Sequence, residues 1–244
     1  MKFPALFLCL SLPLCAGGLD DLKAALGRLQ GRTPIRGRYT VQSWSRSGMG
    51  KESSETVGSV SAGIEDNPGG LLVRWDRATL ARVREESRAR TEEGKTRDSP
   101  SAAMAAANPQ KMAAAVDYAP KLLHLLEASQ WKQERPDIYQ GRTARLLEFQ
   151  VAPRTSEDER KNLKSHSSVA RVWIGPDGTP LGASLSLTTK AKMLMVSMEM
   201  EQQEELCFTV ASGRLLLVRQ EERIHTKSLG VELQQRTLST FTTH

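Results

Sequence analysis

Apolar and polar residues alternate along much of the chain, and this period of two predicts β-strands. Three early strands are expected at residues 38–44, 57–64 and 71–75. In the second of these, one face carries Val60, Ala62 and Ile64. A turn rich in Asn, Pro and Gly at 66–70 separates it from the third, so the pattern is typical of a meander.

The same alternation returns in the second half of the chain. The strands expected there cover residues 142–151, 169–174, 181–187, 191–200, 205–211, 214–226 and 229–241. Short turns join them, including the Gly-Pro-Asp-Gly sequence at 175–178. Five or more successive antiparallel strands predict an α+β fold, mainly antiparallel β, with a curved sheet or open half-barrel covered by helices.

Helical spacing of apolar residues marks three segments. Residues 19–29 predict a short amphipathic helix, with Asp20 and Asp21 in its first turn. Asp76 is a good N-cap for a helix that runs to Glu93. The mixture of Arg and Glu at 82–93 indicates a solvated helix face or, alternatively, a docking surface.

A third helix is expected at residues 109–128. Asn108 caps it, Pro109 starts it, and Pro120 should kink or split it. Residues 94–108 are expected to be a mobile connection. The whole therefore predicts one β-rich domain over 19–244, with a helical and mobile insertion at about 76–128.

The N-terminus has the features of a signal peptide over residues 1–18. Lys2 precedes an apolar run at 3–14, and small residues follow, with cleavage expected near Ala16 to Gly18. The run is too short to span a bilayer as a helix, which disfavours an uncleaved anchor. Leucine and proline before Cys15 disfavour lipidation there. We therefore expect a periplasmic or secreted protein without a transmembrane segment in the mature chain.

Composition narrows the class of protein further. Of 244 residues, 25% are charged and 39% hydrophobic, which excludes a multi-span membrane protein and a wholly disordered chain. The net charge is +6, but basic and acidic residues are interleaved rather than gathered into a stripe. Nucleic acid is therefore not an expected partner.

Cysteine and methionine offer little chemistry. Cleavage of the signal peptide leaves Cys207 alone, in an apolar stretch typical of a small buried side chain. Four methionines, which suit Cu(I), are close in sequence: Met193, Met195, Met198 and Met200. On one straight strand they would divide between opposite faces, two on each, so four sulfur ligands cannot converge. No metal and no cofactor are expected.

The sequence evidence for catalytic groups is also weak. The histidines His124, His166, His225 and His244 lack the paired spacing of a zinc site. Ser129 and Lys132 have the Ser-x-x-Lys spacing of one helical turn, but its companion motifs are missing, and a helix cap with a surface lysine explains the pair. No other nucleophile, phosphate-binding loop or metal motif occurs, so we expect no enzyme.

The apolar strand faces and the leucine-rich helix have two interpretations. They either close over a solid core or line a cleft for an apolar ligand. The candidate ligand-binding residues are Tyr39, Val41, Trp75, Leu122, Leu126, Trp173, Leu185, Leu187 and Leu217.

The order of elements resembles the bacterial lipoprotein-localisation factors of the LolA and LolB type. A signal peptide precedes a leucine-rich helix at 19–29, a strand with Tyr39-Thr-Val-Gln42, further strands, helices and closing hairpins. The resemblance implies an open barrel that binds a lipid, an acyl chain or a lipoprotein without catalysis. The Arg/Glu-rich and Ala-rich segment at 76–116 departs from it. The alternative is an envelope protein-interaction or structural module with a filled core.

Overall fold

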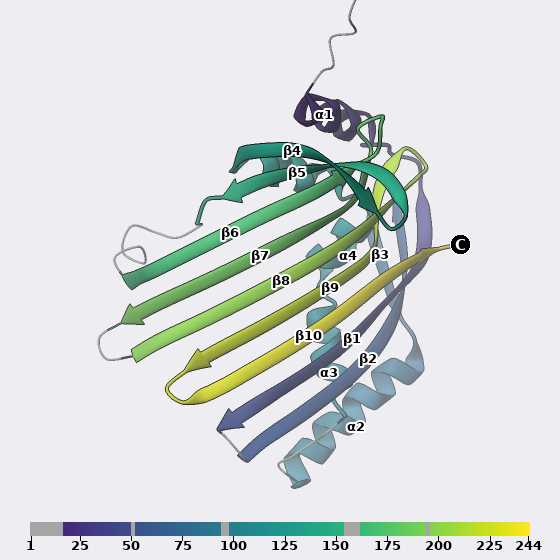
Figure 1. Ribbon diagram of the computed structural model, residues 1–244. Helices are drawn as coiled ribbons and strands as arrows, with labels where there is room; N and C mark the ends of the chain where they lie inside the picture. The colour runs from purple at the N-terminus through teal and green to yellow at the C-terminus, as the bar shows by residue number, and fades with distance from the viewer. Residues whose placement is uncertain (1–16, 50–51, 94–97, 154–161, 194–195) are drawn as a thin grey trace, which may run out of the picture.

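A computed structural model describes residues 17–49, 52–93, 98–153, 162–193 and 196–244. Ten strands form one antiparallel sheet there, and five helices accompany them (Figure 1). The strands are β1 (Ile35–Met49), β2 (Glu52–Asn67), β3 (Gly70–Trp75), β4 (Ser129–Tyr139), β5 (Arg142–Val151), β6 (Leu163–Ile174), β7 (Pro180–Met193), β8 (Val196–Ala211), β9 (Arg214–Ser228) and β10 (Val231–Thr243). The expected α+β fold with a curved antiparallel sheet is confirmed.

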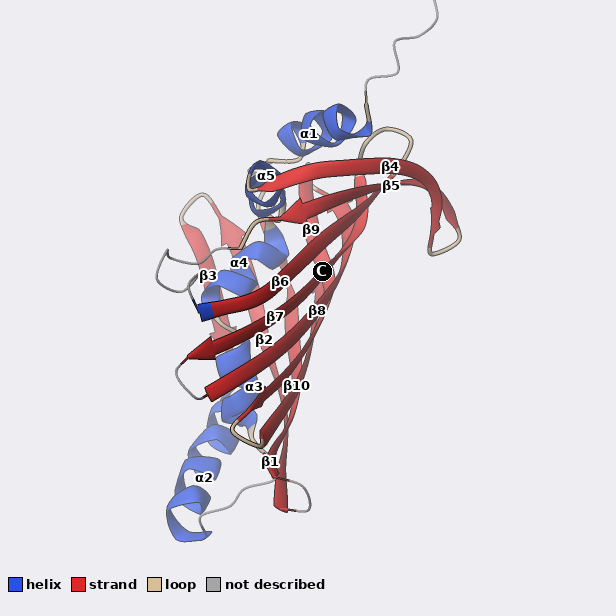
Figure 2. Cartoon of the chain, turned by 60° about the vertical axis from the view of Figure 1, so that its left-hand side comes forward, coloured by secondary structure: helices blue, strands red, loops and turns tan. Residues whose placement is uncertain are grey.

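The spatial order of the strands is β3-β2-β1-β10-β9-β8-β7-β6-β5-β4. The first and last strands are neighbours, with Tyr39 opposite Phe241. The sheet does not close on itself, so β3 and β4 are its two edges. It curves strongly, and the helices lie on one side of it, which we call the inner face (Figure 2).

The helices are α1 (Gly18–Arg28), α2 (Arg77–Glu93), α3 (Pro100–Ala106), α4 (Pro109–Val116) and α5 (Ala119–Glu127). Their caps follow the sequence: Asp76 accepts a 2.6 Å hydrogen bond from the amide of Thr79, and Asn108 accepts one of 2.9 Å from that of Lys111. As expected, the 109–128 segment is split: α4 ends at Val116, and Pro120 occupies the first turn of α5.

Two expectations for the chain path are wrong. Residues 100–106, assigned to a mobile connection, form α3, because Ser99 caps a segment of proline and alanine suited to a helix. Residues 191–200 are not one strand, because β7 ends at Met193 and β8 runs from Val196 to Ala211.

Two apolar clusters fill much of the inner face. The first joins α1 and α5 to strands β5 to β9, and Leu22, Leu122 and Phe149 are fully or almost fully buried in it. The second joins α3 and α4 to β1, β2 and β10 around Val41 and Met112. Burying these faces removes a continuous apolar surface from water, which is the main force holding helices to sheet.

The expected signal peptide falls almost wholly on residues 1–16, which lie outside the described residues. The helix expected after it is confirmed as α1. Among the helices that the structure describes, none has both the length and the apolar character needed to cross a bilayer.

Candidate functional site

An apolar cavity lies on the inner face where α5 meets strands β6, β7 and β8. Its volume is about 300 Å³. The apolar lining comes from Leu125, Val151, Ala152, Pro153, Ala183, Leu185, Leu187 and Leu206. The same region also contains polar side chains, so the cavity has an apolar wall and a polar one.

Helix α5 forms one wall of the cavity, and it also contributes to the first core cluster. Leu122 and Leu126 point into the first core cluster and are buried. Residues 121, 124 and 125 line the cavity, and of these Leu125 also packs against the first core cluster. The helix therefore closes the core with leucines and faces the cavity with Lys121, His124 and Leu125.

Strands β6, β7 and β8 form the opposite wall with the side chains that alternation directs inward. Leu185 of β7 pairs with Ala170 of β6 and with Glu204 of β8, and all three face inward. Leu187 is the next inward residue of β7, beside Ser168. Ser186, between the two leucines, faces outward and is exposed.

Glu204 is the carboxyl group of this cavity. Burial raises its pKa and so does the charge of Glu222, whereas Lys121 and a hydrogen bond from Gln220 act in the opposite direction. The ammonium group of Lys121 lies 5.1 Å from the centre of the Tyr118 ring. The polar side of the cavity thus contains a carboxyl group whose pKa burial raises and a cation on an aromatic face.

His166 is a second polar group in the wall. Its Nδ1 lies 3.2 Å from the hydroxyl of Thr189. Its Nε2 is buried and has no hydrogen-bond partner within the described part of the chain. A ligand with a polar group could satisfy this nitrogen.

The structure brings two of the nine predicted ligand-binding residues into this cavity, Leu185 and Leu187. Five others are buried in the two cores: Tyr39 and Val41 in the second cluster, and Leu122, Leu126 and Leu217 in the first. Trp75 is half-buried and packs on the second cluster. Trp173 belongs to the outer face, where its indole N–H donates a 2.9 Å hydrogen bond to Asp137.

Sequence reasoning missed Lys121, His124, Leu125, His166 and Glu204. A signal for Glu204 existed, because alternation along 198–206 places it on the same face as Met200 and Leu206. A charged residue on an apolar strand face is unusual unless it has a partner or a function. The alternation of β6 gives the same signal for His166, which shares a face with Ala170 and Val172.

The other candidate chemistry does not assemble. Ser129 and Lys132 lie on β4, not on a helical turn, and they hydrogen-bond to the carbonyl of Leu125 and to Gln130 respectively. Met193 is on β7, Met198 and Met200 share the inner face of β8, and Met195 lies outside the described residues. Cys207 is a free, half-buried thiol. In the described ranges, no group of three His, Cys, Asp or Glu side chains is placed to hold a metal ion.

Comparisons of the chain with protein-family models, with curated proteins and with solved structures give no match. The cavity itself offers apolar contact area, one cation, one carboxyl group and two imidazoles. Such a set is suited to holding an apolar molecule with a polar end.

Proposed function

We propose that the protein is a non-enzymatic carrier that binds a lipid, an acyl chain or the acyl anchor of a lipoprotein in the inner-face cavity. The observation that carries the proposal is the accessible leucine wall, Leu125, Leu185 and Leu187, on a face that helices otherwise fill. The resemblance to lipoprotein-localisation factors led to the same class of ligand. Because the sequence predicts a signal peptide, we propose that this carrier is periplasmic or secreted.

The size of the cavity is compatible with a short apolar group. About 300 Å³ lies at the lower end of the usual range for small-molecule sites. Each buried methylene contributes about 0.8 kcal/mol, so roughly six methylenes supply about 5 kcal/mol before the cost of association. We therefore expect one acyl chain, only part of which is enclosed.

The first test is native mass spectrometry of protein purified without detergent, followed by organic extraction. Lipid bound at near-stoichiometric amount supports the carrier. Protein that is empty and also fails to bind the fluorescent apolar probe N-phenylnaphthylamine contradicts it.

A pair of variants locates the binding. Leu187→Arg places a charge in the cavity wall, whereas Ser186→Arg places the same charge on the exposed outer face of the same strand. We expect Leu187→Arg to lose probe binding and Ser186→Arg to keep it, with both variants folded by circular dichroism. Leu187 is half-buried and suits this test better than Leu217, whose burial in the core makes unfolding the expected result. Equal binding by the two variants would place the ligand elsewhere.

The alternative is an envelope protein-interaction or structural module. Helix α2 favours it, because Arg82, Glu85 and Arg88 are exposed on it, and so do the unpaired edges β3 and β4. If the purified protein holds no lipid, chemical crosslinking in the envelope becomes the decisive experiment. A partner crosslinked to α2 or to an edge strand would then support the module.

A further inference from the structure

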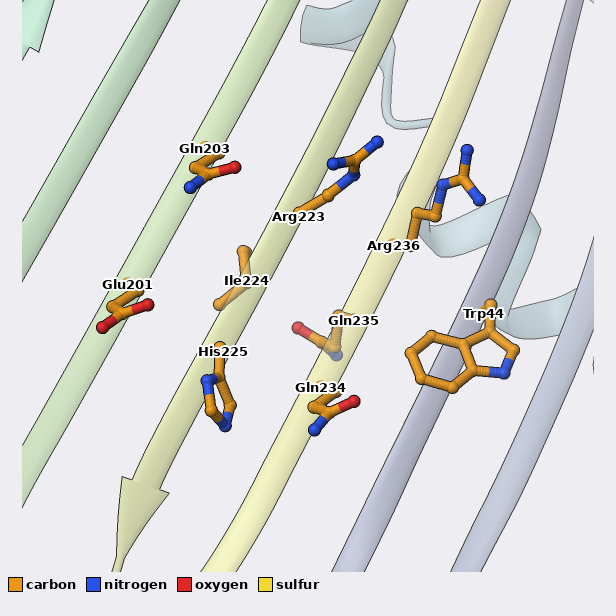
Figure 3. A pocket seen from close by; sticks show the side chains of 9 residues that line it. All are labelled: Trp44, Glu201, Gln203, Arg223, Ile224, His225, Gln234, Gln235 and Arg236. Carbon is orange, nitrogen blue, oxygen red and sulfur yellow. The ribbon is translucent and has the colours of Figure 1, made fainter.

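A shallow hollow of about 320 Å³ lies on the outer face of the sheet, away from the helices (Figure 3). Four of its side chains form one row across adjacent strands: Gln203 of β8, Arg223 of β9, Arg236 of β10 and Trp44 of β1. Each is directly opposite the next in the strand register. Three strand spacings separate the ends of the row, about 14 Å.

A buried carboxylate holds the arginines of this row in place. The Glu221 side chain is only 4% exposed. Its Oε1 accepts hydrogen bonds from Nε of Arg223 at 2.9 Å, from Nη2 of Arg223 at 2.6 Å and from Nε of Arg236 at 2.9 Å. Arg219 bonds the other carboxylate oxygen. The guanidinium groups are therefore oriented before any ligand arrives.

Both arginines keep donors to spare. Nη1 of Arg223 and both terminal nitrogens of Arg236 have no protein partner among the described residues. Each of the two side chains is 54% exposed. Two fixed guanidinium groups with free N–H groups are a good match for a carboxylate or phosphate group.

Trp44 provides an apolar platform at the end of the row. Figure 3 shows its indole lying over β1 with the ring face turned toward the viewer, beside Gln234 and Arg236. The next row adds Glu201, His225 and Gln234. Nε2 of His225 and Nε2 of Gln234 both contact the Glu232 carboxylate, so this row mainly offers acceptors, the Glu201 carboxylate and the Gln234 amide oxygen. A flat apolar ring face beside planar polar side chains suits the hydroxyl-rich ring of a sugar.

We propose that this hollow binds an acidic oligosaccharide, with a sugar ring against Trp44 and an acidic group on Arg223 and Arg236. The row length is matched to a short stretch of sugar units rather than to one small ion. Gln203 lines this hollow and Glu204, the next residue of β8, lines the inner-face cavity, so the two sites lie on opposite faces of the sheet. The proposal does not depend on the carrier function.

The test is titration calorimetry of the purified protein with tetragalacturonic acid. Neutral cellotetraose, inorganic phosphate and adenosine monophosphate are the comparison ligands. We expect saturable binding of the acidic sugar, at least tenfold weaker binding of the neutral one, and weaker binding of the other two. Absence of saturable tetragalacturonate binding overturns the proposal, and so does equal or tighter binding of phosphate or of the nucleotide.

Surface variants identify the residues. Trp44→Ala and Arg236→Gln should each weaken binding at least tenfold. Trp131→Ala, which removes another partly exposed tryptophan, and Arg38→Gln, six residues away on β1, should leave it unchanged. Loss of binding in these controls equal to that of the site variants would contradict the site.

Glu221→Gln distinguishes the effect of fixed arginine orientation on binding from the effect of the net charge of the hollow. This change makes the patch more positive by one charge but releases the arginines. If orientation matters, binding weakens in a variant that is still folded by circular dichroism. Tighter binding would show that net charge alone attracts the ligand, and would overturn the proposed site.

Discussion

The backbone carbonyl of Ser99 lies directly over Gly58, where a β-carbon would overlap it. The amide of Ser99 also donates a 2.7 Å hydrogen bond to the carbonyl of Val57. The start of α3 is therefore packed against the inner face of β2 at Gly58, which has no side chain to keep the helix away. Close packing of this kind transmits any increase in volume to the helix.

Gly58→Ala should destabilise the protein by about 1–3 kcal/mol, because the added methyl group must push α3 away from β2. Urea unfolding measures the change. The matched control is Gly63→Ala on the same strand, where the nearest atom to a new β-carbon is 3.8 Å away. That variant should stay within about 1 kcal/mol of the parent protein. Equal stability of the two variants would show that α3 is not seated on Gly58.

Glu86 should be the residue of α2 whose removal most affects α3. It is 5% exposed and accepts hydrogen bonds from the hydroxyl of Ser99, at 2.5 Å, and from the amide of Ser101, at 2.7 Å. Glu86→Ala removes the buried acceptor of these two hydrogen bonds, which costs about 1–3 kcal/mol. Unfolding by urea and faster amide exchange at Ser101 would both report the loss. Glu85→Ala, at an exposed neighbouring position, should change neither measurement.

Most of the sheet could be predicted because one buried face imposes alternation on every central strand. Residues after Trp131 could be assigned to β structure, but strand β4 could not be given bounds, because it is an edge strand whose side chains are exposed or half-exposed, and Pro136 lies within it. Helix α3 was missed because its local signal, the Ser99 cap before proline and alanine, is short, and its start is also supported by Glu86 and the backbone of Val57, which are distant in sequence. The break between β7, which ends at Met193, and β8, which begins at Val196, was missed because the sequence at 193–196 is apolar and has no Gly, Pro or Asn.

The candidate site was predictable only in part, because alternation along a strand is visible in the sequence but the position of a covering helix is not. Leu185 and Leu187 could be placed on an inner strand face from alternation alone. Whether that face is covered depends on where α5 lies, and the sequence pattern of a helix does not specify its position on a sheet. Because of the position of α5, Lys121 and His124 line the cavity. Leu217 is buried in the core instead.

Gly182→Ala should detach the end of the β4–β5 hairpin from the outer face. Tyr139 folds over Gly182, with its ring 5.3 Å from that of Trp173 and its hydroxyl 3.4 Å from the sulfur of Cys207. A β-carbon on Gly182 would overlap the Tyr139 hydroxyl. Tyr139 must then move, which uncovers Trp173 and Cys207.

The rate of alkylation of Cys207, followed by peptide mass spectrometry, measures this movement. We expect a severalfold increase in Gly182→Ala, together with a red shift in tryptophan fluorescence. Gly63→Ala, where nothing crowds the new methyl group, is again the control. An unchanged alkylation rate would mean that Tyr139 does not shield the thiol.

Glu204 should make stability depend on pH. Burial raises its pKa above the ordinary value of 4.5, so the folded protein holds the proton to higher pH than the unfolded chain does. The folded state then binds more protons in this window, and the free energy of unfolding contributed by Glu204 falls as pH rises through it. Glu204→Gln removes this contribution.

Urea unfolding of Glu204→Gln and the parent protein at about pH 4 and about pH 7 tests the sign. The variant should gain stability relative to the parent as pH rises. Glu205→Gln, which replaces an exposed carboxyl group on the outer face of β8, is the control. A difference between variant and parent that is the same at both pH values would contradict the assignment.

The same carboxyl group should couple pH to ligand binding in the proposed carrier. An apolar chain in the cavity displaces water from Glu204, which disfavours its charged form further. The parent protein should therefore bind N-phenylnaphthylamine more tightly as pH falls from about 7 to about 5. In Glu204→Gln the affinity should be high and independent of pH over this range. If the variant keeps the pH dependence of the parent, a group other than Glu204 is responsible for it.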